Sequence, residues 1–395
     1  MSTDPVVIVG AARTPMGGFQ GDFATLPAAR LGEVAIKAAV ERAGIAADQI
    51  DEVIMGCVLP AGQGQAPARQ ASRGAGLPDA VGCTTINKMC GSGMKAAMLA
   101  NDLLMAGSNR VMVAGGMESM SNSPYLLDKA RGGYRMGHGR VLDHMFLDGL
   151  EDAYERGRLM GTFAEDTAQT YQFTRDQQDG FAITSLKRAQ AAIDDGSFAA
   201  EIAPVTIRSA RGAATIAIDE QPKKANIEKI PTLKPAFRDG GTVTAANSSS
   251  ISDGAAALVL MRRSEAERRK LAPLATLLGH ATHAQAPALF TTAPVGAIQK
   301  LLDRVKWRQR DVDLYEINEA FAVVSLVAMR DLDLPHDIVN VHGGACALGH
   351  PIGASGARIM VTLMAALKQR GLRRGIASLC IGGGEATAVA VELVP

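Results

Sequence analysis

The sequence predicts an α/β protein made of two similar halves, the first of which carries a long insertion. Three observations lead to this prediction. Short apolar runs alternate with helix-like segments, a pattern typical of a parallel sheet covered by helices. Residues 42–56 align without gaps on residues 304–318, which indicates an internal duplication. Glycine makes up 42 of the 395 residues and clusters after the predicted strands, where tight turns and ligand-binding backbone are expected.

The first half is expected to alternate strands and helices. The apolar run at 6–9 predicts a strand, and Pro27 opens a helix that Gly44 ends. A second strand is predicted at 53–55. Further strands are expected at 84–86 and 111–114, with a helix at 94–105 between them.

The segment at 121–244 does not take part in the repeat, and it is interpreted as an inserted loop domain. We therefore divide the chain into a first half at 1–120 plus 245–270, the insertion at 121–244, and a second half at 271–395. The first half is expected to resume with a strand at 258–260. The second half is expected to contain strands at 314–317 and 376–379 and a helix at 359–367.

Composition and charge exclude several function classes. Hydrophobic residues make up 47% and charged residues 21%, which is typical of a folded protein. The chain carries 41 basic and 40 acidic residues, a net charge of +1, and only 4% aromatics, which argues against a nucleic-acid-binding surface. No apolar stretch reaches the roughly 18 residues that a membrane-spanning helix needs. We expect neither nucleic acid nor a membrane as partner.

The cysteines indicate a reducing compartment. The chain has five of them: Cys57, Cys83, Cys90, Cys346 and Cys380. They form no C-x-x-C pair and no zinc spacing, and an odd number fits free thiols. His280 and His283 lack a third ligand nearby, so no metal site is predicted. The expected location is the cytoplasm.

Two cysteines lie at positions suited to chemistry. Cys90 precedes Gly-Ser-Gly and a helix, where backbone N–H groups and the helix dipole are expected to lower the pKa of its thiol. Cys380 ends an apolar strand and precedes three glycines whose N–H groups suit an oxyanion hole. Either cysteine could instead be a small buried core residue.

Two further residues are candidates for assisting a thiol. His350 lies in a glycine-rich loop before a helix, where a histidine can orient or deprotonate a thiol, although a purely structural histidine is the alternative. Asn318 follows the strand at 314–317, where it could hold a water at a reacting centre or simply cap a helix.

Two further sequence patterns bear on the type of chemistry. Gly91-Ser-Gly93 matches a loose dinucleotide-binding pattern, with Glu118 as its acidic partner, but the match is isolated. A nicotinamide-dependent oxidoreductase is therefore the alternative from a different class. No Gly-x-Ser-x-Gly sequence is present, so a hydrolase serine is not indicated.

Five sequence blocks, in order along the whole chain, resemble the thiolase family, most closely its short-chain acetyl-CoA acetyltransferases. The blocks are Asn87-Lys-Met-Cys90-Gly-Ser-Gly93, Gly115-Gly-Met-Glu-Ser-Met120, Asn318-Glu-Ala-Phe-Ala322, Gly349-His-Pro-Ile-Gly-Ala-Ser-Gly356 and Cys380-Ile-Gly-Gly-Gly384. The resemblance implies two mixed sheets in a five-layered αβαβα core with an inserted loop domain, assembled as a homodimer or homotetramer. It also implies reversible condensation of two acetyl-CoA to acetoacetyl-CoA and coenzyme A, without a cofactor.

The resemblance gives each catalytic candidate a role. Cys90 would take the acyl group as a thioester after His350 activates its thiol, and Cys380 would be the second acid and base. His350 and a water held by Asn318 would face the enolate oxygen. The backbone N–H groups of Cys90 and Gly382 would face the tetrahedral intermediate.

The resemblance also implies contacts to coenzyme A, with Ser249 and Ala245 beside the pantetheine chain. The expected walls of that tunnel are Phe237, Phe321 and Met160. The chain departs from the short-chain pattern at five positions, namely Leu159 in place of His, Phe290 in place of Met, Pro222 in place of a basic residue, Glu385 in place of an apolar residue and Cys346 in place of an aliphatic one.

The departures bear on the substrate rather than on the reaction. Phe290 is bulkier than Met and predicts a small acyl pocket. The alternative within the family is a broader degradative 3-ketoacyl-CoA thiolase. A relative that keeps the fold without turnover is disfavoured, because Cys90, His350, Asn318 and Cys380 are all present.

Overall fold

A single hydrogen-bonded sheet runs through both halves of the chain in the computed structural model, which describes residues 4–209 and 212–394. Its strands pair in the order β12-β13-β14-β11-β1-β10-β5-β3-β4, and β2 pairs with β10. The strands are β1 (Val6–Arg13), β2 (Gly17–Gly18), β3 (Glu52–Gly56), β4 (Gly82–Ile86), β5 (Val111–Ser119), β10 (Ser252–Arg262), β11 (Ala275–Ala284), β12 (Leu314–Ile317), β13 (Arg374–Ile381) and β14 (Glu385–Leu393).

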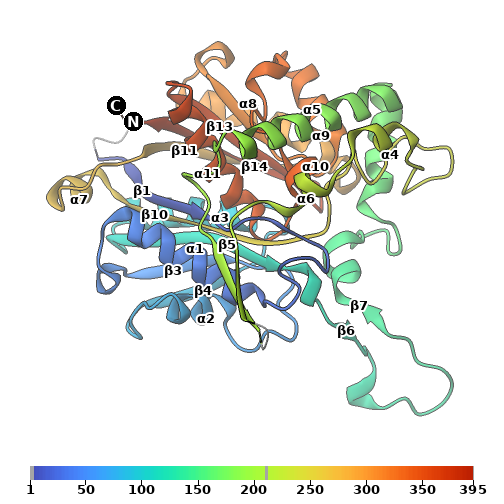
Figure 1. The fold of residues 1–395 in the computed structure, drawn as a ribbon, viewed down its shortest axis with the longest axis horizontal. Helices are drawn as coiled ribbons and strands as arrows, with labels where there is room; N and C mark the ends of the chain where they lie inside the picture. The colour runs from blue at the N-terminus through green and yellow to red at the C-terminus, as the bar shows by residue number, and fades with distance from the viewer. Residues whose placement is uncertain (1–3, 210–211, 395) are drawn as a thin grey trace.

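The two halves of this sheet meet at a narrow seam between β1 and β11. Only Val7 with Thr276 and Ile8 with Ala275 pair across it. Figure 1 shows the blue first half below this seam and the orange and red second half above it, with both termini on the same side. The halves are therefore two sheets joined along a short edge.

The element order confirms the predicted duplication. In the first half α1 (Ala28–Ala43) leads to β3, and α3 (Ser92–Ala106) leads to β5. In the second half α8 (Ala293–Val305) leads to β12, and α11 (Ser355–Gln369) leads to β13. The aligned segments 42–56 and 304–318 are the ends of α1 and α8, a short 3-10 turn, and the strands β3 and β12.

The sheet is mixed, which confirms the fold that the resemblance implied, whereas strand–helix alternation alone predicted only parallel pairing. β3 is parallel to β4 and β5, and β12 is parallel to β13, as the strand–helix alternation requires. β10 and β14 are antiparallel to their neighbours. β14 follows β13 through a glycine hairpin at 382–384, which is too short for the crossover that parallel pairing needs.

Three hydrophobic cores separate the helices into layers. On β1, Val7 and Val9 face an outer core with α1, while Val6 and Ile8 face a central core with α3 and α11. A third core packs α8 and α9 (Ala322–Asp331) on the outer face of the second half. The result is the five-layered αβαβα arrangement, and it explains why a strand buried on both faces reads as a continuous apolar run.

The central helices α3 and α11 meet in a contact that only glycine allows. A Cβ at Gly93 would lie 2.9 Å from the backbone N of Ala357, and a Cβ at Gly356 would overlap the backbone of Met94. Gly116 at the end of β5 faces the carbonyl of Gly353 in the same way. The N-terminal ends of α3 and α11 are thus held against each other between the two halves.

The insertion covers the end of the molecule beside this contact. Its helices are α4 (Met160–Tyr171), α5 (Arg175–Asp194) and α6 (Glu220–Lys224), and its strands are β6 (Tyr125–Leu126), β7 (Leu142–Asp143), β8 (Val205–Ser209) and β9 (Gly212–Ile216). The remaining helices of the chain are α2 (Pro67–Gly74), α7 (Arg263–Arg268) and α10 (Ala345–Leu348). The division at 120, 244 and 270 stays a prediction, which the return of β10 to the first half's sheet supports.

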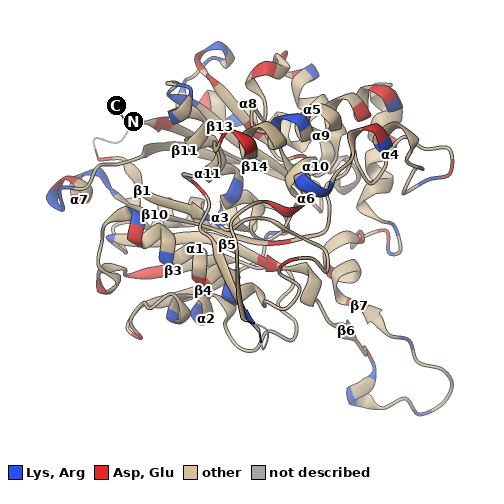
Figure 2. Cartoon of the chain, in the orientation of Figure 1, with Lys and Arg blue, Asp and Glu red and all other residues tan. Residues whose placement is uncertain are grey.

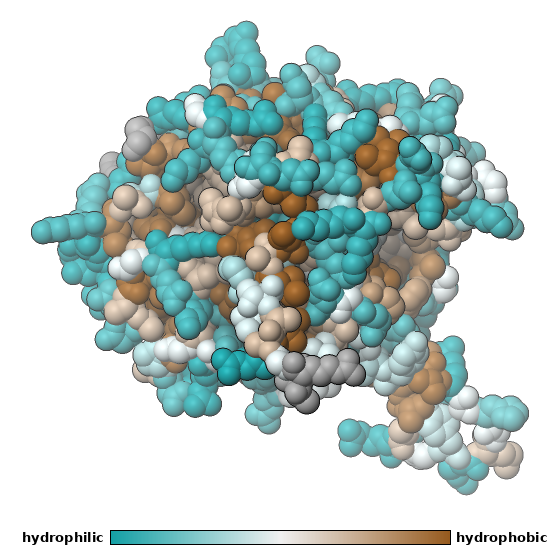
Figure 3. Space-filling model, in the orientation of Figure 1, coloured by the Kyte–Doolittle hydropathy of each residue, from teal (hydrophilic) through white to brown (hydrophobic). Residues whose placement is uncertain are grey.

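Residues 125–143 form an arm that projects from the body in Figure 1. Tyr125, Leu127, Met136 and Val141 are exposed on it, and Figure 3 shows apolar side chains gathered where the arm leaves the body. Elsewhere, acidic and basic residues are interspersed over both halves of the chain (Figure 2). Among the described residues, no helix has both the length and the apolarity needed to cross a membrane.

Candidate active site

A cavity of about 450 Å³ opens between the two halves, beside the glycine contact of α3 and α11. All the predicted site residues except Asn318 line it, namely Cys90, His350, Cys380, Gly382, Ser249, Ala245, Phe237, Phe321, Met160 and Phe290. Asn318 lies directly behind His350, with its Nδ2 3.5 Å from the Nε2 of the histidine. The structure therefore brings the whole predicted set together from segments far apart in the chain.

Cys90 is presented by a tight turn between β4 and α3. The N–H of Lys88 donates to the Oγ of Ser92 at 2.8 Å, and the N–H of Ser92 donates to the carbonyl of Met89 at 3.0 Å. Met89 is left at φ 47°, a left-handed conformation that costs a residue with a side chain about 1–3 kcal/mol. This strain places the Cys90 thiol in the cavity, directly before the N-terminus of α3.

The predicted lowering of the Cys90 pKa is wrong for the protein without ligand. Burial raises the pKa of its thiol to about 11, although the N–H groups of Gly382 and of Cys90 itself lower it. Loss of water around the sulfur outweighs the hydrogen bonds and the helix dipole. The thiol therefore rests protonated, and it needs a base to become a nucleophile.

His350 is suited to be that base. Its Nδ1 lies 2.6 Å from the Oγ of Ser355, whose own proton goes to the carbonyl of Pro351 at 2.9 Å. The serine oxygen must then accept a hydrogen bond from Nδ1–H, which leaves Nε2 with a free lone pair. Burial, together with the charge of Arg358, lowers the pKa of His350 to about 3, so the ring is neutral at pH 7.

Cys380 faces the same space from the end of β13. It is buried, and burial raises the pKa of its thiol well above the ordinary value, with the neighbouring Cys90 raising it further. The N–H of Gly382 donates toward the sulfur of Cys90. The two cysteines thus lie close enough to act on one substrate, and both hold their protons at rest.

Aromatic rings form one wall of the cavity. The ring centroid of Phe290 lies 6.2 Å from that of Phe163 and 6.4 Å from that of Phe321, with the rings edge to face. Phe237 packs on Phe321 at 5.9 Å. The wall is rigid and bulky, which fits a small acyl group better than a long chain.

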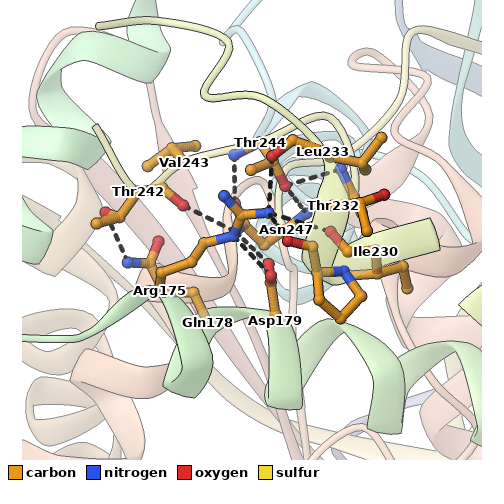
Figure 4. Close-up of polar contacts among 12 residues, drawn as sticks. Arg175, Gln178, Asp179, Ile230, Thr232, Leu233, Thr242, Val243, Thr244 and Asn247 are labelled. Carbon is orange, nitrogen blue, oxygen red and sulfur yellow. Dashed lines mark hydrogen bonds and ion pairs between the residues drawn. The ribbon is translucent and has the colours of Figure 1, made fainter. Parts of the chain in front are cut away.

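The loop at 242–250, which carries Ala245 and Ser249, is held from below by α5. Figure 4 shows Arg175 and Asp179 between this loop and the segment 230–233. Asp179 accepts from Asn247 Nδ2 at 2.9 Å and pairs with Arg175 at 2.6 Å, and Arg175 also donates to the carbonyls of Ile230 and Leu233. These bonds fix the backbone on which the cavity wall is built.

The dinucleotide alternative does not fit the structure. The backbone at the start of α11 packs directly against Gly93, which leaves no room there for a pyrophosphate. Glu118 is fully buried and accepts from the N–H groups of Val58, Leu59 and Gly353, so it does not face a ribose. Among the described residues there is no cluster of three potential metal ligands.

The sequence did not indicate a role at this site for Ser355 or Arg358. It indicated Glu118 only as the acidic partner of a dinucleotide-binding pattern, not as a structural anchor. Ser355 follows His350 by five positions in the same loop, so its spacing was an available signal. Glu118 joins the halves by accepting the N–H of Gly353, and burial raises its pKa to about 7. Arg358 donates to the Oδ1 of Asn318 at 3.4 Å.

The chain is similar to known proteins over nearly its full length. The thiolase N-terminal domain matches residues 6–264, and the thiolase C-terminal domain matches residues 271–393. Acetyl-CoA acetyltransferase 2 of Arabidopsis thaliana is 49% identical over 392 residues, covering 98% of this chain and 97% of that protein. An acetyl-CoA acetyltransferase of Cupriavidus necator is 49% identical over 389 residues, covering 98% and 99%.

Solved structures agree as well. The acetyl-CoA acetyltransferase of Bacillus anthracis has a TM-score of 0.96 at 42% identity, with 99% of each chain covered. The Acat5 thiolase of Ascaris suum in complex with coenzyme A has a TM-score of 0.93 at 41% identity, covering 99% of this chain and 100% of that one. With both halves matched over nearly their full length, the chain belongs to the thiolase family.

Proposed function

We propose that this protein is an acetyl-CoA C-acetyltransferase, which joins two acetyl-CoA into acetoacetyl-CoA and coenzyme A and catalyses the reverse thiolysis. One observation carries the proposal: two protonated thiols, Cys90 and Cys380, and a neutral histidine line one small cavity. That set supports covalent acyl transfer followed by proton transfer at carbon. The relatives named acetyl-CoA acetyltransferase support the substrate.

Thiolysis begins at Cys90. His350 Nε2 takes the thiol proton, and the sulfur attacks the ketone carbon of the 3-ketoacyl-CoA. The resulting oxyanion accepts from the N–H groups of Cys90 and Gly382, a pair of donors in which each can be worth about 10²-fold in rate. Collapse of this intermediate breaks the carbon–carbon bond and leaves an acyl group on Cys90.

The departing fragment is the enolate of acetyl-CoA. His350 now carries the proton from Cys90, so its Nε2–H and the amide of Asn318 are donors for the enolate oxygen, directly or through a water. Cys380 gives its proton to the enolate carbon, a role that suits a thiol of raised pKa.

The second half-reaction restores the enzyme. The Cys380 thiolate takes the proton of an incoming coenzyme A thiol, and the new thiolate attacks the acyl group on Cys90. Cys90 leaves as a thiolate and receives the proton held by His350. Condensation runs the same steps backwards, so side chains and backbone groups supply all the chemistry and no cofactor is required.

Coenzyme A is proposed to reach Cys90 along the walls formed by Ser249, Ala245, Phe237, Phe321 and Met160, which all line the cavity. We also propose a homodimer or homotetramer, supported by the exposed apolar side chains of the arm at 125–143. Five free cysteines support a reducing compartment, and we propose the cytoplasm.

The test is coenzyme A-dependent loss of acetoacetyl-CoA, run beside a medium-chain 3-ketoacyl-CoA. We expect cleavage of acetoacetyl-CoA, its loss in Cys90→Ala, and a trapped acyl-enzyme without turnover in Cys380→Ser. Faster cleavage of the longer substrate would assign the protein as a broader degradative thiolase instead. Full turnover by Cys90→Ala would overturn the covalent mechanism.

A further inference from the structure

A fully buried arginine lies directly behind Asn318. Arg358 belongs to the first turns of α11, and its side chain is 1% exposed. Its Nη2 donates to Asn318 Oδ1 at 3.4 Å, and its Nη1 lies 3.7 Å from a carboxylate oxygen of Glu316. The Nε and Nη1 atoms of Arg358 and the Oε1 of Glu316 have no hydrogen-bond partner among the described protein groups.

The loose pairing of Arg358 with Glu316 is expected to contribute little to the free energy of unfolding. A buried ion pair offsets the cost of losing water only where its geometry is close and its remaining protons are bonded. Arg13 shows the contrast, because it is equally buried but pairs closely with both Glu201 and Asp219. A charge held so loosely beside a reacting group therefore calls for another explanation.

The explanation is in the direction of its hydrogen bond. A guanidinium only donates, so the Asn318 atom that faces Arg358 must be the carbonyl oxygen. The amide nitrogen then points toward His350 Nε2, at 3.5 Å. Resting on the function proposed above, we infer that Arg358 is a positioning residue that keeps the Asn318 amide turned with its N–H groups toward the enolate oxygen.

The opposite orientation would disable the enolate site. If the amide turned over, Asn318 Oδ1 would face His350 and accept the Nε2–H that the histidine gains from Cys90. The enolate oxygen would then lose both donors in one movement. Formation of the acyl-enzyme would be spared, because its oxyanion lies against the N–H groups of Cys90 and Gly382.

This difference between the two steps gives the test. We would measure three quantities with Arg358→Lys and Arg358→Met: acylation of Cys90 by acetyl-CoA, read by mass spectrometry; exchange of the acetyl-CoA methyl protons into heavy water; and thiolysis of acetoacetyl-CoA. In Arg358→Lys, which keeps the positive charge near His350, we expect acylation of Cys90 and the KM for acetoacetyl-CoA to stay within about twofold of wild type. Methyl exchange and thiolysis should fall at least tenfold, toward the ~10²-fold loss expected when an oxyanion donor is removed.

Two controls separate positioning from folding. Arg13→Lys replaces an arginine that is equally buried but does not contact Asn318. If this variant affects activity, it should lower acylation of Cys90 and methyl exchange by the same factor. On an Asn318→Ala background, Arg358→Lys should cause no further loss of exchange, since there is no amide left to orient.

The inference fails if Arg358→Lys loses acylation and exchange in parallel, if it loses neither, or if its loss of exchange adds to that of Asn318→Ala. A wild-type enzyme that does not acylate Cys90 would instead overturn the proposed function. Should Arg358→Met not fold, the lysine variant carries the test alone.

Discussion

Replacing Phe290 with alanine should convert a narrow acyl cavity into a wider one. The ring of Phe290 is 3% exposed and lines the cavity, and behind it lies Phe163, which does not line it. Removing the ring therefore extends the existing cavity up to the next aromatic side chain. The 450 Å³ space would be enlarged beside Phe321, on which the Phe290 ring packs.

The size of the effect follows from the hydrocarbon that can be buried. Each methylene taken out of water is worth about 0.8 kcal/mol. A six-carbon 3-ketoacyl-CoA is two methylenes longer than acetoacetyl-CoA, so full burial of the extra chain is worth roughly 1.6 kcal/mol, or about 15-fold in kcat/KM. The substitution also removes two edge-to-face ring contacts, and the free energy of unfolding should fall by about 3–5 kcal/mol.

The assay is thiolysis of a series of 3-ketoacyl-CoA substrates, with the ratio of kcat/KM for six and four carbons as the result. Phe163→Ala is the matched control, because it removes a buried ring of the same cluster without opening the cavity wall. We expect the ratio to rise by up to about 15-fold in Phe290→Ala and to stay near wild type in Phe163→Ala. An unchanged ratio in Phe290→Ala would refute the assignment of Phe290 as the limit on chain length.

Three further predictions concern the supports of the site and its acid sensitivity. Ser355→Ala should free the His350 ring to adopt the wrong tautomer and lower kcat by about 10–100-fold with little change in KM; an unchanged kcat would mean that Ser355 does not fix the tautomer. Lys88 and Glu385 form a partly exposed ion pair, so Lys88→Met and Glu385→Gln should each lower kcat/KM by an amount equivalent to under about 1 kcal/mol of transition-state stabilisation. The double variant should lose no more than either single variant, and additive losses would show that the two residues are not coupled. Burial, helped by Arg370, lowers the pKa of His342 to about 4, so the unfolded chain binds a proton near pH 6.5 that the folded chain does not accept until about pH 4. Between pH 7 and pH 5 the free energy of unfolding, measured with urea, should therefore decrease in wild type by about 2 kcal/mol more than in His342→Asn. An equal decrease in the two proteins would contradict this reasoning.

Most of the fold could be predicted from the sequence because its signals are local and occur twice. The caps of α1 and α3, Gly44 and Gly107, both adopt the left-handed conformation that ends a helix. The direction of β10 and β14 could not be predicted in the same way. Strand direction depends on how the chain returns to the sheet after an insertion or a hairpin, and no residue within the strand records it.

The site residues likewise fall into those that local sequence signals could predict and one that they could not. Cys90, His350, Cys380 and Asn318 stand next to glycine clusters or strand ends, so their positions in the sequence already indicate exposure to a ligand. Arg358 gives no such signal, since an arginine inside an apolar helix normally extends toward solvent. Its contact with Asn318 exists only because α11 packs behind β12.

The pKa of Cys90 could not be predicted for a related reason. The helix dipole is a local property, but the depth at which the thiol is buried is set by both halves together. Glu385 shows the same dependence on tertiary structure: it stood out as a departure from the family pattern, and its partner Lys88 lies 297 positions away in the chain.

The contact of α3 with α11 has a consequence for how the two halves depend on each other. Gly93 and Gly356 occupy positions of the two repeats where each leaves room only for the backbone of the other helix, and Gly116 leaves the same room for Gly353. A side chain gained in one copy would push the ends of both helices apart, and with them the loops that carry Cys90 and His350. A larger residue at either glycine would therefore disturb both loops at once, so this one contact couples the geometry of the two halves of the site.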